Sequence, residues 1–237
     1  MTRRRFIADE VQGDRAALTG EGAAHLARVL RARPGQEFDV VAGDQVRRGR
    51  VVSVDDHRVE LELGEEVPAV SLPDVILLLA IFRFDRMEWA IEKLTELGVA
   101  RIVPVRAERT DVRLAASAEK RVERWRRIAR QATQQARRAS APEIADPESF
   151  AGGLALPAQT RIVLAENEQA YSLQQATQKL NDGSVALAVG PEGGWTAKEL
   201  DRFTAAGWTP ANLGVTVLRA ETAAIAATAV VMARIGE

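Results

Sequence analysis

The chain of 237 residues contains no cysteine and only two histidines. The absence of cysteine excludes disulfides, cysteine-ligated metal sites and a cysteine nucleophile. His25 and His57 lie far apart in the sequence, which argues against a histidine-rich metal site and leaves a Ser-His-Asp triad little to draw on. We therefore expect neither a bound metal nor a hydrolase triad.

Long apolar runs and a secretory signal are also missing. The apolar run Val75–Phe82 is too short to cross a bilayer. The first ten residues, MTRRRFIADE, carry charge but lack the apolar stretch of a signal peptide. With 46% hydrophobic and 27% charged residues, the composition is that of an ordinary soluble globular protein. These features predict a cytoplasmic protein with no membrane partner.

Positive charge is concentrated in one segment, although the net charge of the chain is only -1. Between Arg113 and Arg138 there are nine basic and two acidic residues, a net charge of +7. Most of the basic residues are arginines, whose planar guanidinium suits phosphate. This segment therefore predicts either an RNA-binding surface or a solvated helix face, and charge alone does not decide between them.

The first 66 residues have the pattern of a small β domain. Short alternating runs predict strands at Glu37–Val41, Val46–Val52 and Val59–Leu63, with a hairpin turn at Ala42–Gln45 and one short helix at Gly22–Leu30. The segment Gly64–Pro73 contains two prolines and no clear period, which indicates a linker. We therefore expect two domains, at residues 1–70 and 73–237.

After residue 73 strands and helices alternate, which is typical of an α/β domain with a mostly parallel sheet. The strand Val75–Phe82 is apolar throughout, as a strand buried on both faces would be. Gly98 stands where a helix C-cap belongs, and Thr196 with Glu199 forms a capping box. The other predicted strands are Arg101–Val105, Ile162–Glu166, Val185–Val189 and Ala211–Leu213, and the predicted helices are Met87–Leu97, Glu119–Ala139, Thr196–Ala206 and Glu221–Arg234.

The segment Val185–Trp195 is the most informative for function. A buried strand runs directly into GPEGG (residues 190–194), and a capped helix follows. Ligands of open α/β sheets bind beyond the carboxyl ends of strands, and glycine lets the backbone approach a ligand closely. A tight strand-to-helix turn is the simpler reading, but three glycines and a proline around one glutamate exceed what such a turn needs. The loop matches neither a Walker A motif nor GxGxxG, so nucleoside triphosphates and NAD are not indicated.

A second loop, Leu213–Ala224, should lie beside the first because both follow strands of the same sheet. Within it, Arg219, Glu221 and Thr222 precede a helix. Taken alone, Glu221 and Thr222 are better explained as helix-capping residues than as ligand-binding residues.

These segments together resemble a known family. GPEGGW (190–195), Glu199 and LGVTVLRAETAA (213–224) are similar to the knot region of the SPOUT methyltransferases, and more narrowly to the RsmE family of 16S rRNA uridine-N3 methyltransferases. Further matches follow in family order: HLARVLR (25–31), KLTELGV (93–99), ERT (108–110), and Gln135, Arg138 and Pro142. The chain departs from the family pattern at RFDR (83–86), Gln134 and Ala136.

The resemblance implies a fold, a cofactor and a partner. The fold is a PUA-like β-barrel that binds RNA, followed by an α/β domain with a trefoil knot. The protein would be a homodimer that holds S-adenosylmethionine in the knot loops, needs no metal, and acts on 16S rRNA, within the small ribosomal subunit. The expected cofactor-binding residues are Leu164, Glu166, Gly190, Pro191, Glu192, Gly193, Gly194, Leu213, Gly214, Val217, Leu218, Arg219, Thr222 and Ala223.

The methyl donor carries its own activation, so the protein has to position the acceptor and exclude water. Uridine N3 attacks best after losing its proton, which an arginine near the carbonyl oxygens would favour. The expected catalytic residues are Arg109, Arg138, Arg219 and Glu221, each with a salt bridge as its alternative role. The expected RNA contacts are Arg28, Arg31, Arg124, Arg127 and Arg130. A non-catalytic RNA-binding protein, or a methyltransferase acting on ribose 2′-OH or another base, remains the alternative.

Overall fold

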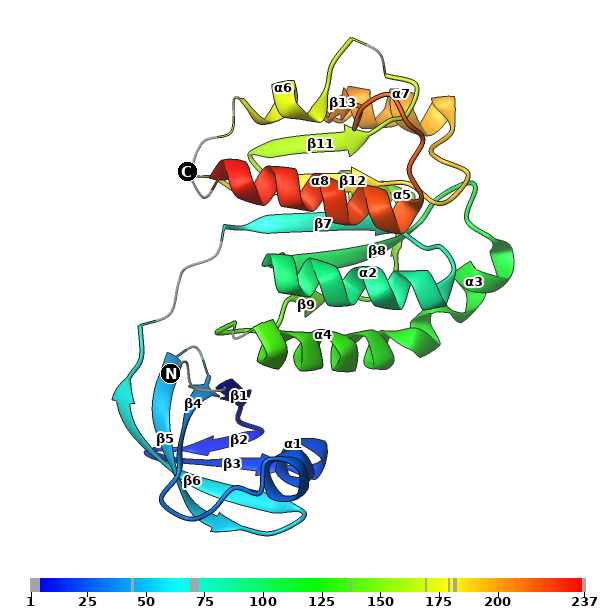
Figure 1. The fold of residues 1–237 in the computed structure, drawn as a ribbon. Helices are drawn as coiled ribbons and strands as arrows, with labels where there is room; N and C mark the ends of the chain where they lie inside the picture. Colours follow the sequence, from blue (N-terminus) through cyan, green and yellow to red (C-terminus); the bar gives the residue numbers. More distant parts are fainter. Residues whose placement is uncertain are drawn as a thin grey trace. The chain divides into compact units, whose positions relative to one another are not determined.

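The computed structural model describes residues 5–43, 45–68, 73–136, 138–168, 170–178, 180 and 183–235. The chain divides into two compact units, residues 1–71 with 133–141 and residues 72–132 with 142–237 (Figure 1). The second part of the first unit includes the last turn of helix α4 (Val122–Ala136).

The first unit is built on a six-stranded mixed sheet. Its strands are β1 (Arg5–Ile7), β2 (Glu10–Gln12), β3 (Arg15–Thr19), β4 (Glu37–Ala42), β5 (Gln45–Val54) and β6 (Arg58–Glu66), in the order β1-β4-β5-β6-β3-β2. The β1–β4 pair is parallel and the other pairs are antiparallel. Alternate residues of β6, Val59, Leu61 and Leu63, are buried in its core. The predicted hairpin is confirmed, because Ala42 pairs with Gln45.

The sheet curls until its two ends nearly meet. Ala8 and Asp9 connect β1 to β2, the strands at opposite ends of the sheet. The amide of Ala8 donates to Val41 O on β4 at 3.0 Å, and the amide of Asp9 donates to Ala17 O on β3 at 2.9 Å. Two consecutive residues thus bond to strands that are far apart in the sheet order, which requires a partly closed barrel such as the family resemblance implied.

Helix α1 (Gly20–Ala24) continues into a π-helical turn, His25–Val29, where one helix was predicted. The amide of Leu30 donates to His25 O at 3.1 Å, and that of Ala32 to Leu26 O at 3.0 Å. Between these two amides lies Arg31, with φ of 50°. It is the one non-glycine residue with positive φ in the described part of the chain, and this region of φ is costly for a side chain with a Cβ.

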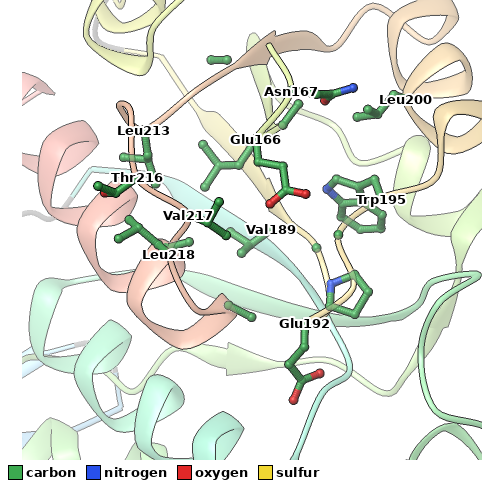
Figure 2. A pocket seen from close by; sticks show the side chains of 18 of the residues that line it. Glu166, Asn167, Val189, Glu192, Trp195, Leu200, Leu213, Thr216, Val217 and Leu218 are labelled. Carbon is green, nitrogen blue, oxygen red and sulfur yellow. The ribbon is translucent and has the colours of Figure 1, made fainter. Parts of the chain in front are cut away.

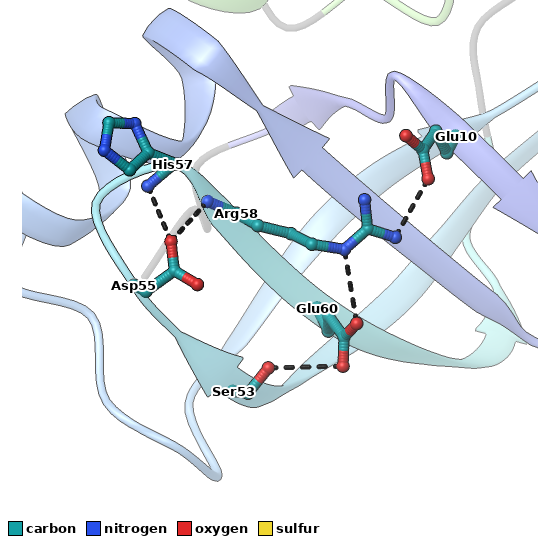
Figure 3. Close-up of polar contacts among 6 residues, drawn as sticks. All are labelled: Glu10, Ser53, Asp55, His57, Arg58 and Glu60. Carbon is teal, nitrogen blue, oxygen red and sulfur yellow. Dashed lines mark hydrogen bonds and ion pairs between the residues drawn. The ribbon is translucent and has the colours of Figure 1, made fainter.

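Polar side chains order the β5–β6 hairpin (Figure 3). Asp55 Oδ1 accepts from the amides of His57 and Arg58 at 2.7 and 2.8 Å, and these bonds lower the pKa of Asp55 below its ordinary value. The guanidinium of Arg58 then bridges Glu10 and Glu60 at 2.9 and 3.2 Å, which connects β6 to β2. Both carboxylates are substantially exposed, so these pairs contribute little stability.

The second unit is built on a seven-stranded sheet in which every pair is parallel. Its strands are β7 (Val75–Ala80), β8 (Arg101–Arg106), β9 (Glu143–Ile144), β10 (Glu148–Ser149), β11 (Thr160–Leu164), β12 (Val185–Val189) and β13 (Thr209–Ala211). The order is β10-β8-β7-β12-β11-β13, with β9 also paired to β8. The predicted mostly parallel α/β sheet is confirmed. Every residue of β7 and β12 is buried, as central strands of such a sheet should be.

Helices cover both faces of this sheet (Figure 1). On one face Val75, Leu77 and Leu79 share a core with α2 (Phe84–Leu97), α4 and α8 (Ala220–Ile235). On the other face Ile76 and Leu78 pack against an aromatic cluster from α5 (Phe150–Leu154), α7 (Ala197–Ala205) and the loops beside them. That cluster consists of Phe150, Trp195, Phe203 and Trp208.

The end of β13 hydrogen-bonds to two separate segments of the chain. The carbonyl of Ala211 accepts from Ala165 N at 3.0 Å, just beyond β11. Asn212 N donates to Tyr171 O at 3.0 Å and Asn212 O accepts from Leu173 N at 2.8 Å, next to α6 (Leu173–Thr177). Residues 211–212 therefore join the segment after β11 to the start of α6 before the chain reaches α8.

Several predicted boundaries were wrong. The predicted helix Glu119–Ala139 is a 3₁₀ turn (Ala118–Arg121) followed by α4, and the short helix α3 (Val112–Ser117) before it was not predicted. β6 runs into the predicted linker as far as Glu66. The predicted strand Ala211–Leu213 is β13, which ends at Ala211.

Candidate functional site

A cavity of about 380 Å³ opens at the carboxyl edge of the parallel sheet, in the second unit. Loops after β11, β12 and β13 enclose it, as expected of a ligand site in an open α/β sheet (Figure 2). The two loops that the sequence singled out are thus brought together. The predicted residues that line the cavity are Leu164, Glu166, Gly190, Pro191, Glu192, Gly194, Leu213, Gly214, Val217, Leu218 and Ala223.

Three predicted cofactor-binding residues do not line the cavity. Gly193 packs against the side chain of Arg109, while Arg219 and Thr222 are exposed. The cavity is also lined by residues that were not predicted. Most of them are next to predicted residues in the same loops, and this neighbourhood in the sequence is the signal that could have identified them. They are Ala165, Asn167, Val189, Trp195, Ala197, Leu200, Ala211, Val215, Thr216 and Ala220.

The glycine loop needs its glycines for two different reasons. A Cβ on Gly190 would lie 3.3 Å from both Trp195 N and Trp195 Nε1, because the tryptophan folds back over the end of β12. Gly194 has φ of +67°, and its amide donates to Pro191 O at 2.8 Å. The loop is therefore a tight turn whose inner side is bare backbone, which a ligand can approach closely.

The loop of Glu108, Arg109 and Thr110 holds this turn in place. Arg109 Nη1 donates to Gly193 O at 2.6 Å, and the rest of its side chain packs on Gly193. Thr110 Oγ1 donates to Ile81 O at 3.2 Å, beyond the end of β7. Arg109 lines the cavity, as its predicted catalytic role requires, but its guanidinium is already bonded to the glycine loop.

Glu199 connects the same two segments from inside the protein. Its side chain is buried, and its oxygens accept from Glu108 N and Thr196 N, each at 2.8 Å. The predicted capping box of α7 is therefore confirmed and extends to a neighbouring loop. Glu192, by contrast, points away from the centre of the cavity (Figure 2) and accepts from Arg83 N at 3.2 Å, at the start of α2.

Asn212 braces the loop that forms the opposite wall. Its Nδ2 donates to Glu168 O and Tyr171 O, and its Oδ1 accepts from Gly214 N at 3.0 Å. Beyond this brace, Val215 and Val217 are almost completely exposed, although both line the cavity. This wall is thus anchored at its base and apolar toward its tip.

The other predicted catalytic residues lie apart from the cavity lining. Glu221 is buried and forms an ion pair with Arg86 of α2, so its side chain joins α2 to α8. Arg138 belongs to the first unit, where burial lowers its pKa to about 10, and it remains protonated at neutral pH. Arg219 is exposed between the lining residues Leu218 and Ala220, and its guanidinium has no hydrogen bond or ion pair in the described part of the chain.

Several arginines of the basic segment 113–138 are already paired with acidic residues of the protein. Arg124 donates to both carboxylate oxygens of Glu88 at 2.6 and 2.8 Å. Arg126 is bonded to Glu123, Asp146 and Ile144 O. Among the predicted RNA contacts, Arg28 pairs with Asp56 at 2.9 Å. The guanidinium groups of Arg31, Arg127 and Arg130 are exposed and without an internal partner as far as the structure describes the chain.

The described residues offer neither a metal site nor a membrane-spanning helix. They contain no group of three or more histidine, aspartate or glutamate side chains placed to hold a metal ion. None of their helices combines the length and the apolar character needed to cross a membrane.

Comparison with known proteins agrees with this geometry. Residues 70–232 match the family model of an RNA methyltransferase domain, and residues 18–64 match that of an RNA methyltransferase PUA domain. Ribosomal RNA small subunit methyltransferase E of Mycobacterium tuberculosis is 33% identical over 228 residues, which cover 90% of this chain and 84% of the relative. The chain belongs to the ribosomal RNA small subunit methyltransferase E family.

Other members of the methyltransferase E family support the same assignment. The Bacillus subtilis member is 31% identical over 219 residues, covering 87% of this chain and 85% of the relative. The crystal structure of the Neisseria gonorrhoeae member, bound to S-adenosyl methionine, superposes with a TM-score of 0.84 at 31% identity and 96% coverage of both chains. The family resemblance and the fold inferred from the sequence are thus confirmed.

Proposed function

We propose that this protein transfers a methyl group from S-adenosylmethionine to small-subunit ribosomal RNA, with the donor bound in the cavity between the glycine loop and Leu213–Leu218. The main observation behind this proposal is the cavity itself, which is lined by bare glycine backbone at the carboxyl edge of the sheet. The donor-bound structure of the Neisseria gonorrhoeae relative supports the choice of ligand. The acceptor we propose is N3 of a uridine in 16S rRNA.

The donor supplies an activated methyl group, so the residues of this chain have to bind, orient and exclude water. The side chains around the cavity are suited to excluding water, because Val189, Leu200 and Leu213 are apolar. The transfer itself needs no metal, because the donor is already activated. Glu221 has a structural partner in Arg86, which favours its alternative role as a salt-bridge residue. Arg219 flanks the cavity and has no partner among the described residues, and it is the cation we assign to the developing negative charge on the uridine.

Arg109 has a different part in this proposal. Its bond to Gly193 O shapes the glycine loop, so we expect Arg109→Ala to weaken donor binding. Arg219→Ala should instead lower the single-turnover rate about 100-fold with donor affinity unchanged, as loss of one electrostatic donor typically does. Equal rates for Arg219→Ala and the parent protein would remove Arg219 from the chemical step.

RNA binding is proposed for residues 1–70 together with the free arginines of α4. Arg31, Arg127 and Arg130 are exposed and have no internal partner in the described residues, so they can release counterions when they meet phosphates. The substrate is 16S rRNA, within the small ribosomal subunit, and a cytoplasmic location follows from that substrate. Residues 73–237 would then carry the catalytic function.

We further propose a homodimer formed through the second unit. The inward face of α8 is used within the chain, because Ala224, Ala227 and Val231 are completely buried. On exposed faces, Val230 of α8 and Trp89 of α2 remain 38% and 48% accessible. Large apolar side chains left open on two packed helices suit a second copy of the chain. Light scattering should give twice the mass of the chain, and a monomer at working concentration would contradict the dimer.

One assay tests the activity. The protein is incubated with labelled S-adenosylmethionine and small ribosomal subunits from cells that lack the enzyme, and the labelled nucleotide is mapped. Label at a uridine base supports the proposal. Label on a ribose hydroxyl or another base would keep the enzyme and change the acceptor. Binding of RNA without any label transfer would indicate a non-catalytic RNA-binding protein.

A further inference from the structure

The indole nitrogen of Trp195 is a buried hydrogen-bond donor without an acceptor. Trp195 is 7% exposed, and its Nε1 has no hydrogen-bond partner in the described part of the chain. A buried N–H that has given up water without gaining another acceptor destabilises the protein by roughly the cost of its desolvation. Such groups are uncommon in proteins and call for a reason at each position.

The position of this nitrogen supplies the reason. Trp195 lines the cavity, and its Nε1 lies 3.3 Å from the point where a Cβ on Gly190 would stand. A side chain at position 190 would cover this edge of the indole, and its absence leaves a space there that is open to the cavity. The nitrogen edge of the indole faces the carboxylate of Glu166 across this space, and no hydrogen bond joins the two groups (Figure 2).

The ring itself is fixed by packing. Its centroid lies 4.9 Å from that of Phe203 and 5.9 Å from that of Phe150, in the aromatic cluster behind the sheet. The neighbouring Trp208, in the same cluster, donates from Nε1 to Leu154 O at 3.2 Å. One tryptophan of the cluster thus has its partner inside the protein, while the other presents its donor to the cavity.

We propose that Trp195 Nε1–H donates a hydrogen bond to an acceptor atom of the bound methyl donor and so fixes its position above Gly190. This inference rests on the proposed function, since the ligand is S-adenosylmethionine. Acceptors occur in both halves of that molecule, as nitrogen and oxygen atoms of the adenosine and as the carboxylate of the methionine part. The hydrogen bond is the shared chemistry, and the test distinguishes the two sources.

The test replaces the indole with a ring that lacks the donor. Trp195→Phe should weaken binding of S-adenosylmethionine about five- to tenfold in calorimetry, which corresponds to one neutral hydrogen bond. The Tm without ligand should hold or rise, because the unsatisfied N–H has been removed. A purely structural role for the indole would instead lower the ligand-free Tm and leave affinity unchanged.

Two other tryptophans provide matched controls. Trp208→Phe leaves Leu154 O without its donor, so it should lower the ligand-free Tm and keep the parent affinity. Trp125 also has a buried Nε1 with no partner among the described residues, but it does not line the cavity. Trp125→Phe should therefore change neither the affinity nor the response to ligand.

A spectroscopic measurement makes the test independent of packing changes. In ¹⁵N-labelled parent protein, the indole resonance that disappears in Trp195→Phe should shift on adding S-adenosylmethionine, while that of Trp125 stays in place. Adenosine and methionine are then titrated separately, and the one whose affinity falls in Trp195→Phe contains the acceptor. Parent-like affinity for S-adenosylmethionine in Trp195→Phe, or an unmoved Trp195 resonance, would overturn the inference. Parent protein that does not bind S-adenosylmethionine would refute the proposed function instead.

Discussion

Replacing Arg31 with glycine should stabilise the protein and weaken its binding to RNA. Arg31 follows the π-helical turn with φ of 50°, where a residue with a Cβ costs about 1–2 kcal/mol. Glycine removes that cost but adds about 0.5–1 kcal/mol of backbone entropy on folding. The net gain is therefore about 0–1.5 kcal/mol, which for a chain of this size raises the Tm by up to about 6 °C.

The RNA side of the same prediction follows from the free guanidinium. Arg31→Gly should reduce the slope of log affinity against log salt by about one, as expected when one phosphate contact is lost. Arg31→Ala should lose the same contact with no gain in Tm, and Arg31→Lys should keep the slope. The assays are differential scanning calorimetry and RNA binding at several salt concentrations. Parent-like RNA affinity in Arg31→Gly, or a lower Tm, would refute the reasoning.

Three further predictions concern separate parts of the molecule. Arg86→Ala leaves the buried Glu221 without its partner and should destabilise the protein by about 3 kcal/mol in denaturant unfolding; Arg86→Lys should recover part of this loss. Gly194→Val places a branched side chain at φ of +67° and should abolish S-adenosylmethionine binding in calorimetry, with an unchanged circular dichroism spectrum. The pKa of Asp55 is lowered by backbone bonds, so its contribution to stability is present above about pH 4 and is lost as the pH falls further; an NMR titration midpoint at the ordinary value would contradict this.

The elements that the sequence predicted well are long or carry their own end signals. Gly98 ends α2 with φ of 102°, and Thr196 begins α7 with its complete capping box. β12 is buried throughout, as its unbroken apolar run indicated. In each case the deciding interaction is local, or the burial is complete, so that a short window of sequence contains the information.

The missed elements are short and depend on distant partners. β9 and β10 have two residues each, and both are defined by pairing with β8, about forty residues earlier in the chain. No hydrophobic period fits into two residues, so only the tertiary pairing makes them strands. The same holds for β1 and β2 in the first unit, whose three residues each lie at the ends of the curled sheet.

Charge counting overestimated the basic surface for a related reason. Glu88 lies on α2, thirty-six residues before Arg124, and its carboxylate accepts from Nε and Nη2 of that guanidinium. A count along the segment 113–138 includes the cations but not the acids that face them from another helix. The cations left for RNA can be recognised only after the neighbouring helices are in place.

The charged residues of the family motifs illustrate the same limit within the site. Glu192 bonds to Arg83 N, Glu221 to Arg86, and Arg109 to Gly193 O, so each of them holds one loop or helix against another. A side chain that is paired in this way would have to break its contact before it could act on the substrate. Its main contribution is therefore to hold the loops and helices in position. The spacing of these residues in the sequence therefore encodes the shape of the cavity as much as its chemistry. Arg219, beside the cavity and without such a partner in the described residues, keeps its charge available for a ligand, and this availability is visible only in the folded chain.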